Sequence, residues 1–262
     1  MKIFALSFAI PLFALNAAMA SEDVISWSSP AGVSRLEESR YKGDFFKLAN
    51  QFESQQNKVF CGVASTTIVL NALRMGKNLP NLPLDEGILA PKDRIYFTQK
   101  NFTPIYARYT QNTVMANSPK LRLSVLGKPR QPGGLPEYGY NLQELTQLLK
   151  SHGVNTRTVY MSSAEKHMKH QLINALSTPE HYVIINYSRE IIGQGAGGHI
   201  SPLAAYHQPS DSFLIMDVAP AREAWVWVPS EILLKAMATA DVASYRGYVI
   251  VSDAASGQQQ SD

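Results

Sequence analysis

The chain has 262 residues, of which 45% are hydrophobic and 17% are charged. This composition is typical of an ordinary globular protein with enough apolar side chains for a sizeable core. The 24 Lys and Arg side chains and 21 Asp and Glu side chains give a formal net charge of +3. Because this excess is small and no Lys/Arg run occurs, charge gives no support to binding of nucleic acid.

Residues 1–20 have the parts of a secretory signal peptide. Lys2 precedes an apolar run over residues 3–15, and Ala18 and Ala20 form an Ala-x-Ala site before the polar residues 21–23. We therefore expect cleavage after Ala20 and export to the periplasm or out of the cell. A membrane anchor is the alternative, but the run falls short of the roughly 20 residues that span a bilayer. No later run is long enough either, so we expect no stable membrane insertion.

The first half of the mature chain predicts one clear helix. Residues 21–50 mix polar and apolar side chains, with turn signals over 29–32. Apolar residues recur at helical spacing over 63–73 and Gly76 follows as a stop, so a helix is predicted there. Residues 77–100 and the Gly- and Pro-rich residues 127–139 are predicted to be loops.

The second half predicts strands with inserted helices. Asn141, with Glu144 in the capping-box position, begins a helix that Gly153 ends. Further helices are predicted over 163–176 and 230–238, and strands over 156–160, 182–187, 199–206, 213–218 and 248–252. A turn over 208–212 makes a hairpin of two of these strands. Helices followed by a mostly antiparallel sheet indicate an α+β fold. We expect one catalytic domain over 21–253 and a disordered tail over 254–262.

Cys61 is the one cysteine of the chain. Exported proteins usually pair their cysteines, so a lone Cys is either a small buried hydrophobe or a working thiol. It lies where a loop becomes a helix, and a helix N-terminus lowers the pKa of a thiol. Gln55, six residues earlier, suits an oxyanion hole made with the Cys61 N–H. This segment alone leaves both interpretations of Cys61 open.

A candidate base and a candidate acid lie on the predicted hairpin. His199 begins a strand after glycines, and Gly198 leaves room for substrate beside a general base. Taken alone, such a His is more often structural. Asp217 lies in an apolar run, where an unpartnered carboxylate is costly to bury, unless it faces solvent at the strand end. If the strands pair, Asp217 orients His199 and stabilises its imidazolium, which completes a triad with Cys61.

Together these motifs resemble the phytochelatin synthase family, including its short bacterial members. The resemblance covers about residues 45–252 and is weakest over 75–140. It rests on Gln55, on the Cys-Gly-Val-Ala-Ser run that begins at Cys61, on the Leu-Asn-Ala-Leu run that begins at Leu70, on the Gly-His-Ile-Ser-Pro motif around His199, and on Asp217 eighteen residues after that His. It implies a papain-like fold, with the Cys on a helix and the His and Asp on a mostly antiparallel sheet.

The resemblance also implies a substrate and further site residues. The family's reaction is cleavage of glutathione to γ-Glu-Cys and glycine through an acyl-enzyme, by a glutathione γ-glutamylcysteinyltransferase or hydrolase. Asp241 and Arg246 match the family's residues that hold the γ-glutamyl group, although a surface Asp and Arg are the simpler interpretation. A carboxylate suits an ammonium group and an Arg fork suits a carboxylate.

One departure from the family concerns transfer to a second substrate. Pro220 stands where the family commonly has an Arg that is thought to serve the acceptor, so we expect hydrolysis to outweigh phytochelatin synthesis. Cleavage itself requires no metal cofactor, but Cd²⁺ or Zn²⁺ could enter as thiolate complexes of the substrate. His167 and His170 lie on a Lys-rich helix face, so we expect no resident metal site there.

Two other functions stay open from the sequence. A papain-like peptidase that trims leader peptides would share the triad and differ in its pocket. A non-catalytic thiol- or metal-binding protein is a weaker candidate, because it would need neither Asp217 nor Gln55. The oligomeric state is also open, with a homodimer as one candidate.

Overall fold

The computed structural model describes residues 24–77, 82–98, 103–129, 131–242 and 244–254. The predicted signal peptide lies outside the described residues, as does all of the predicted tail except its first residue. None of the helices in the described ranges is long and apolar enough to cross a membrane.

The described strands form a single seven-stranded sheet in the order β1-β6-β5-β4-β3-β7-β2. Every pair of neighbouring strands is antiparallel. Short connections such as the β4–β5 turn allow this arrangement. The bounds are β1 Ile25–Ser26, β2 Val154–Tyr160, β3 His181–Ser188, β4 Gly198–His207, β5 Ser212–Ile215, β6 Val226–Pro229 and β7 Gly247–Asp253.

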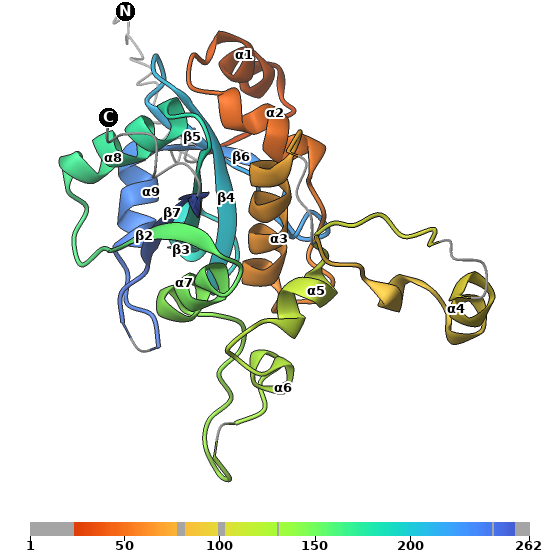
Figure 1. Cartoon of the computed structure of the whole chain (residues 1–262). Coiled ribbons are helices and arrows are strands. Elements are labelled where there is room, and N and C mark those ends of the chain that lie inside the picture. Colours follow the sequence, from red (N-terminus) through yellow and green to blue (C-terminus); the bar gives the residue numbers. More distant parts are fainter. Residues whose placement is uncertain (1–23, 78–81, 99–102, 130, 243, 255–262) are drawn as a thin grey trace, which may run out of the picture.

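Helices cover both faces of this sheet. Figure 1 shows α3 on one side of β4 and the pair α8 and α9 on the other side, while α4 and α6 project from the body. The helices are α1 Pro30–Glu38, α2 Gly43–Asn50, α3 Cys61–Arg74, α4 Pro91–Thr98, α5 Gln111–Ala116, α6 Arg122–Val125, α7 Leu142–Lys150, α8 Lys166–Ser177 and α9 Ser230–Met237, with 3-10 turns at η1 Glu86–Ile88 and η2 Glu190–Ile192. The α+β prediction is confirmed.

Strand alternation divides the apolar side chains between two cores. Successive side chains of a strand point to opposite faces. Accordingly, Tyr182 and Ile184 of β3 pack with α3 and α7, whereas Val183, Ile185 and Tyr187 pack with α8 and α9. The sheet is therefore buried on both sides, which holds the start of α3 rigidly against its strands.

Several predicted elements match the structure closely. Helix α3 begins at Cys61, two residues before the predicted start, and is buried over Gly62–Leu73. The capping box of α7 is present: the Asn141 side chain accepts from the Glu144 N–H at 2.9 Å, and the Glu144 carboxylate accepts from the Asn141 N–H at 3.1 Å. The hairpin of β4 and β5 is also as predicted.

Other predictions need correction. The turn signals at 29–32 mark the start of α1, where the Ser29 hydroxyl accepts from the Gly32 N–H at 3.0 Å and Pro30 opens the helix. The predicted loop over 77–100 contains α4. Helix α8 begins at Lys166, three residues later than predicted, and β5 ends at Ile215, before Asp217.

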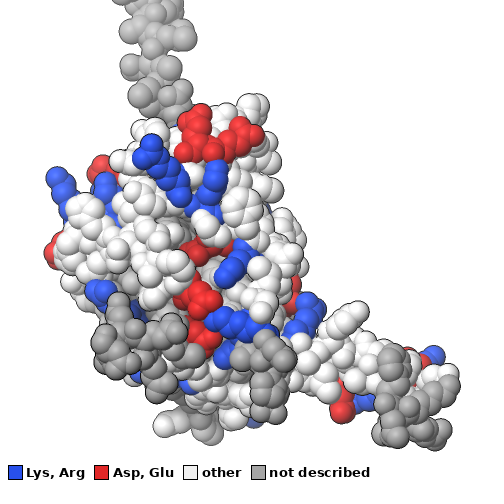
Figure 2. Space-filling view, turned by 45° about the horizontal axis from the view of Figure 1, so that its top comes forward, with Lys and Arg blue, Asp and Glu red and all other residues white. Residues whose placement is uncertain are grey.

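The surface charge is mixed, as the small net charge suggests. Figure 2 shows a face on which basic and acidic side chains lie interspersed, without a broad patch of one sign. This face carries no basic track of the kind that nucleic acid would need.

Candidate active site

Cys61 is the first residue of α3. The N-cap residue, Phe60, has no side chain that accepts a hydrogen bond from the first N–H groups of the helix. Ser65, one turn later, donates its hydroxyl to the Ile200 carbonyl at 3.1 Å and fixes this end of α3 against β4. The thiol is partly buried, and His199 is the side chain that lowers its pKa. The helix N-terminus and β4 together place the sulfur beside the imidazole.

His199 is the second residue of β4 and is buried against Tyr187, whose ring meets it edge-on at 5.8 Å between centroids. Its Nε2 lies 3.0 Å from Oδ1 of Asp217. Because this nitrogen is engaged, Nδ1 is the nitrogen that faces the Cys61 thiol. Asp217 therefore orients the imidazole toward the thiol, as a general base for a thiol requires.

Asp217 follows the end of β5 and is completely buried. Besides His199, it accepts hydrogen bonds from Nη2 of Arg189 at 3.0 Å, the Tyr187 hydroxyl at 3.2 Å and the Ala219 N–H at 2.7 Å. Arg189 also makes an ion pair with the other carboxylate oxygen at 2.7 Å. A carboxylate this deeply buried is stable only when it is paired and hydrogen-bonded, and both conditions are met here.

These contacts favour a charged Cys–His pair. Burial raises the pKa of the Cys61 thiol, but His199 and neighbouring backbone N–H groups together outweigh burial and hold that pKa below its ordinary value. Burial lowers the pKa of His199, but Asp217 and Cys61 outweigh it and raise that pKa. Burial raises the pKa of Asp217, while His199 and Arg189 bring it below its usual range. The three groups therefore favour thiolate, imidazolium and carboxylate.

Gln55 lies near the triad but does not line the cavity that holds Cys61. Its backbone N–H donates to the Val218 carbonyl at 2.8 Å, beside Asp217. Its side-chain Nε2 donates to the Asn57 carbonyl at 2.7 Å, and Oε1 is buried without a hydrogen-bond partner in the described structure. One N–H of the amide is left for an oxyanion, so that role of Gln55 stays a prediction.

A cavity of about 370 Å³ opens at Cys61 and His199. Asp241 and Arg246 line it and lie 3.5 Å apart, and Asn186 of β3 donates to the Asp241 carboxylate at 3.1 Å. A Cβ added at Gly198 would come within 2.5 Å of Nη2 of Arg246. Gly198 thus leaves room for the guanidinium directly beside His199, and the five predicted residues that line this cavity lie together.

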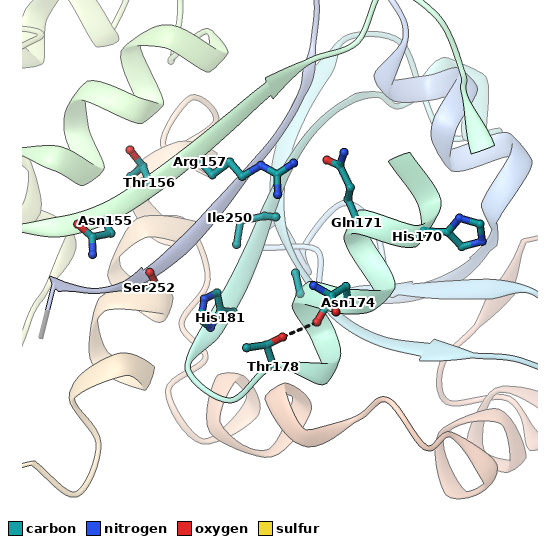
Figure 3. Close-up of a pocket in the computed structure, with 11 residues that line it drawn as sticks. Asn155, Thr156, Arg157, His170, Gln171, Asn174, Thr178, His181, Ile250 and Ser252 are labelled. Atoms are coloured by element: carbon teal, nitrogen blue, oxygen red, sulfur yellow. Dashed lines mark hydrogen bonds between the residues drawn. The ribbon is translucent and has the colours of Figure 1, made fainter. Parts of the chain in front are cut away.

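A wider hollow of about 650 Å³ lies elsewhere, between β2, β7 and α8. Figure 3 shows Arg157 of β2 facing Gln171 of α8 across it, while the ring of the preceding residue, His170, points away from Arg157. It holds no thiol and no acidic side chain, so we place the chemistry at the smaller cavity. Within the described ranges, no three His, Cys, Asp or Glu side chains gather as a metal would need.

Sequence reasoning missed several residues of the site. Arg189 and Tyr187 hold Asp217, Asn186 holds Asp241, and Lys58 and Glu137 line the cavity. For Arg189, Tyr187 and Asn186, the signal in the sequence is that they are polar residues at or just after the end of the apolar strand over 182–187. Their partners could be known only from the way β3 lies between β4 and β7.

A thiol at a helix start, an imidazole beside it and a buried carboxylate behind the imidazole are the arrangement that a cysteine nucleophile requires. The model of the family described as phytochelatin synthase matches residues 15–248. The chain belongs to the phytochelatin synthase family.

Curated relatives agree with this family. The chain is 25% identical over 238 residues to glutathione gamma-glutamylcysteinyltransferase 3 of Lotus japonicus, covering 88% of this chain and 43% of the relative. It is 25% identical over 219 residues to the glutathione gamma-glutamylcysteinyltransferase of Schizosaccharomyces pombe, covering 82% and 45%. The chain thus spans less than half the length of these relatives.

Two solved structures are similar in part. The peptidase domain of Streptococcus ComA covers 78% of this chain and 98% of its own, with a TM-score of 0.39 and 10% identity. Xylellain, a cysteine protease from Xylella fastidiosa, covers 84% of this chain and 88% of its own, with a TM-score of 0.40 and 13% identity.

Proposed function

We propose that this chain is a cysteine-nucleophile enzyme that cleaves a γ-glutamyl thiol peptide such as glutathione to γ-Glu-Cys and glycine. The observation that carries the proposal is the placement of Asp241 and Arg246 in the same cavity as Cys61 and His199. A carboxylate beside a guanidinium can bind the α-ammonium and α-carboxylate of a γ-glutamyl group. Membership of the family and the names of its curated relatives support the same substrate class.

The proposed reaction is ping-pong acyl transfer. The Cys61 thiolate attacks the carbonyl carbon of the Cys–Gly bond, and an S–C bond forms. The C–N bond then breaks, the departing nitrogen takes the proton held by His199, and glycine leaves. Water attacks the γ-Glu-Cys thioester while His199 accepts its proton, and the S–C bond then breaks, which releases γ-Glu-Cys and restores the Cys61 thiolate and the His199 imidazolium. Asp217 keeps the imidazole oriented throughout.

We propose that water outcompetes a second glutathione as acceptor. The side chain two residues after Pro220, Arg222, donates to the Ala196 carbonyl of the glycine-rich segment at 3.3 Å. The position of Pro220 itself offers no cation for an acceptor carboxylate. Phytochelatin formation would then be the minor outcome.

Metals and location are further parts of the proposal. Cleavage is proposed to need no cofactor, and Cd²⁺ or Zn²⁺ would enter only as thiolate complexes of the substrate. Residues 1–20 support export to the periplasm or beyond, where the enzyme would meet glutathione outside the cytosol. A fusion reporter that stayed in the cytosol would contradict that location.

The test is incubation of the mature protein with glutathione, with and without Cd²⁺, followed by mass spectrometry of the products. Cys61→Ala is the control, since it removes the nucleophile and little volume. We expect the wild type to release γ-Glu-Cys and glycine in equal amounts, with longer γ-Glu-Cys oligomers only as traces. Cys61→Ala should release neither product. Untouched glutathione would overturn the substrate assignment and leave a peptidase acting on another peptide as the candidate to test.

A further inference from the structure

The cavity at Cys61 has charged side chains that enter it from different elements. Asp241 and Arg246 come from the segment between α9 and β7. Lys58 comes from the segment that leads into α3, three residues before Cys61. The two cations of the cavity lining, Arg246 and Lys58, therefore come from separate segments of the chain.

The two cations also differ in how they are engaged. Arg246 donates to the Ala240 carbonyl at 2.7 Å and faces Asp241. Lys58 is exposed, and its ammonium group makes no hydrogen bond or ion pair with any side chain or backbone group that the structure describes. Lys58 is thus a cation of the cavity lining, three residues before the nucleophile, that has no partner among the described residues.

The proposed substrate has a charge for each of these groups. The γ-glutamyl end carries an ammonium and a carboxylate, which Asp241 and Arg246 match. The glycine that leaves carries a second carboxylate, separated by one carbon from the nitrogen of the scissile bond. A group that binds it must lie near the Cys61 sulfur on the side away from the γ-glutamyl end, and a flexible lysine stem from Lys58 can supply it.

We infer that Lys58 binds the carboxylate of the leaving residue, so that the site selects peptides with a single residue and a free carboxylate after the scissile bond. This inference rests on the proposed function and deepens it. The carboxylate keeps its charge from the bound substrate through the transition state, so Lys58 stabilises both about equally. Loss of such uniform binding raises KM and leaves kcat nearly unchanged.

The experiment pairs two substrates with two enzymes. Glutathione and its glycine ethyl ester, in which the leaving carboxylate is masked, are given to the wild type and to Lys58→Met, and initial rates of glycine or glycine ester release are measured. Comparison of the two enzymes cancels the different leaving ability of the two amines. Lys166→Met, at an exposed lysine of α8 outside the cavity, is the matched control.

We expect Lys58→Met to raise KM for glutathione about fivefold, the effect of a solvent-exposed ion pair, with little change in kcat. KM for the ester should be the same in both enzymes, and Lys58→Arg should restore the preference for glutathione. Equal KM changes for both substrates, or no change, would overturn the inference and leave the proposed function standing. A wild type that cleaves neither substrate would overturn both.

Discussion

At the scale of single residues, Asp217 orients His199 and favours its charged form. Its carboxylate has no exposed surface and receives Arg189, Tyr187 and a backbone N–H as well as His199. These donors fix the oxygen that meets Nε2 of His199, and thereby fix which ring nitrogen faces the thiol. The negative charge also favours the imidazolium form that accompanies the Cys61 thiolate.

Asp217→Asn therefore should change the pH dependence as well as the rate. Asp217 raises the pKa of His199 against burial, so its loss should lower that pKa. The imidazolium then loses its proton at lower pH, and the alkaline limb of kcat/KM should move to lower pH. We expect kcat/KM to fall about 10³–10⁴-fold, because an amide also favours the wrong tautomer. The profile of kcat/KM against pH measures both effects.

The control for this variant is Glu231→Gln, an exposed carboxylate at the start of α9. An alkaline limb that stays in place in Asp217→Asn would mean that Asp217 does not set the charge of His199. The apparent pKa values of such a profile belong to the coupled Cys61–His199 pair.

The residue types of the triad were predictable from the sequence, but their supporting partners were not. Cys61, His199 and Asp217 stand out because each has polar chemistry in an apolar or glycine-rich setting. Arg189 is an ordinary residue after a strand until β3 and β4 pair and bring it to Asp217. Contacts of that kind depend on register and tertiary packing, which periodicity does not contain.

At the scale of elements, prediction succeeded where a helix or strand has a strong pattern. The capped α7 and the buried β3 follow from their own sequences. Helices α1 and α4 were missed because Pro and Gly near their starts read as turns, although Pro is favoured in the first turn of a helix. The end of β5 was misplaced because Met216 and Val218 stay buried after the ladder stops, so apolar character outlasts the strand.

Helix α2 carries a buried carboxyl that should make stability depend on pH. Burial raises the pKa of Asp44 to about 8, only partly opposed by Lys47, and its Oδ2 is buried without a hydrogen-bond partner among the described residues. In the unfolded chain an Asp loses its proton near pH 4. Between these values the folded state holds a proton that the unfolded chain has lost, so the free energy of unfolding falls as pH rises. Above about pH 8 both states have lost the proton, and this group causes no further fall.

Asp44→Asn removes this titration. We expect the variant to gain stability relative to wild type from pH 4 to pH 8, by at most about 1.4 kcal/mol for each pH unit. Urea unfolding at several pH values measures the difference. Asp93→Asn, at an exposed position of α4, should show no such trend. A difference between Asp44→Asn and wild type that stays constant over this range would contradict the assignment.

At the scale of the whole molecule, the site exists because two layers meet. Cys61 belongs to the helical layer, whereas His199 belongs to the sheet and Asp217 follows the end of the interior strand β5. The α+β class and the antiparallel sheet were predictable from element order, because hairpin turns and strand spacing leave few other topologies. The projecting segments with α4 and α6 were not, since their apolar residues are largely exposed and follow no burial pattern.

A change in the core packing of α3 should therefore affect the stability of the fold more than the catalytic rate. Leu70 is fully buried in α3, and Leu70→Ala should lower the free energy of unfolding by about 2–5 kcal/mol. Activity per folded molecule should stay near wild type well below the melting temperature. Denaturant unfolding and kcat measure the two quantities. Leu135→Ala, at a side chain that is 87% exposed, should leave both unchanged, and an equal loss of stability there would contradict this account.

Because the chain has a single cysteine, chemical labelling of its thiol reports on the candidate active site directly. With one cysteine in 262 residues, an alkylating reagent has a single place to react, and that place is the proposed nucleophile. The number of labels per molecule would then count competent sites in any preparation. The rate of labelling against pH would follow the charge of the Cys61 thiol directly, without any substrate.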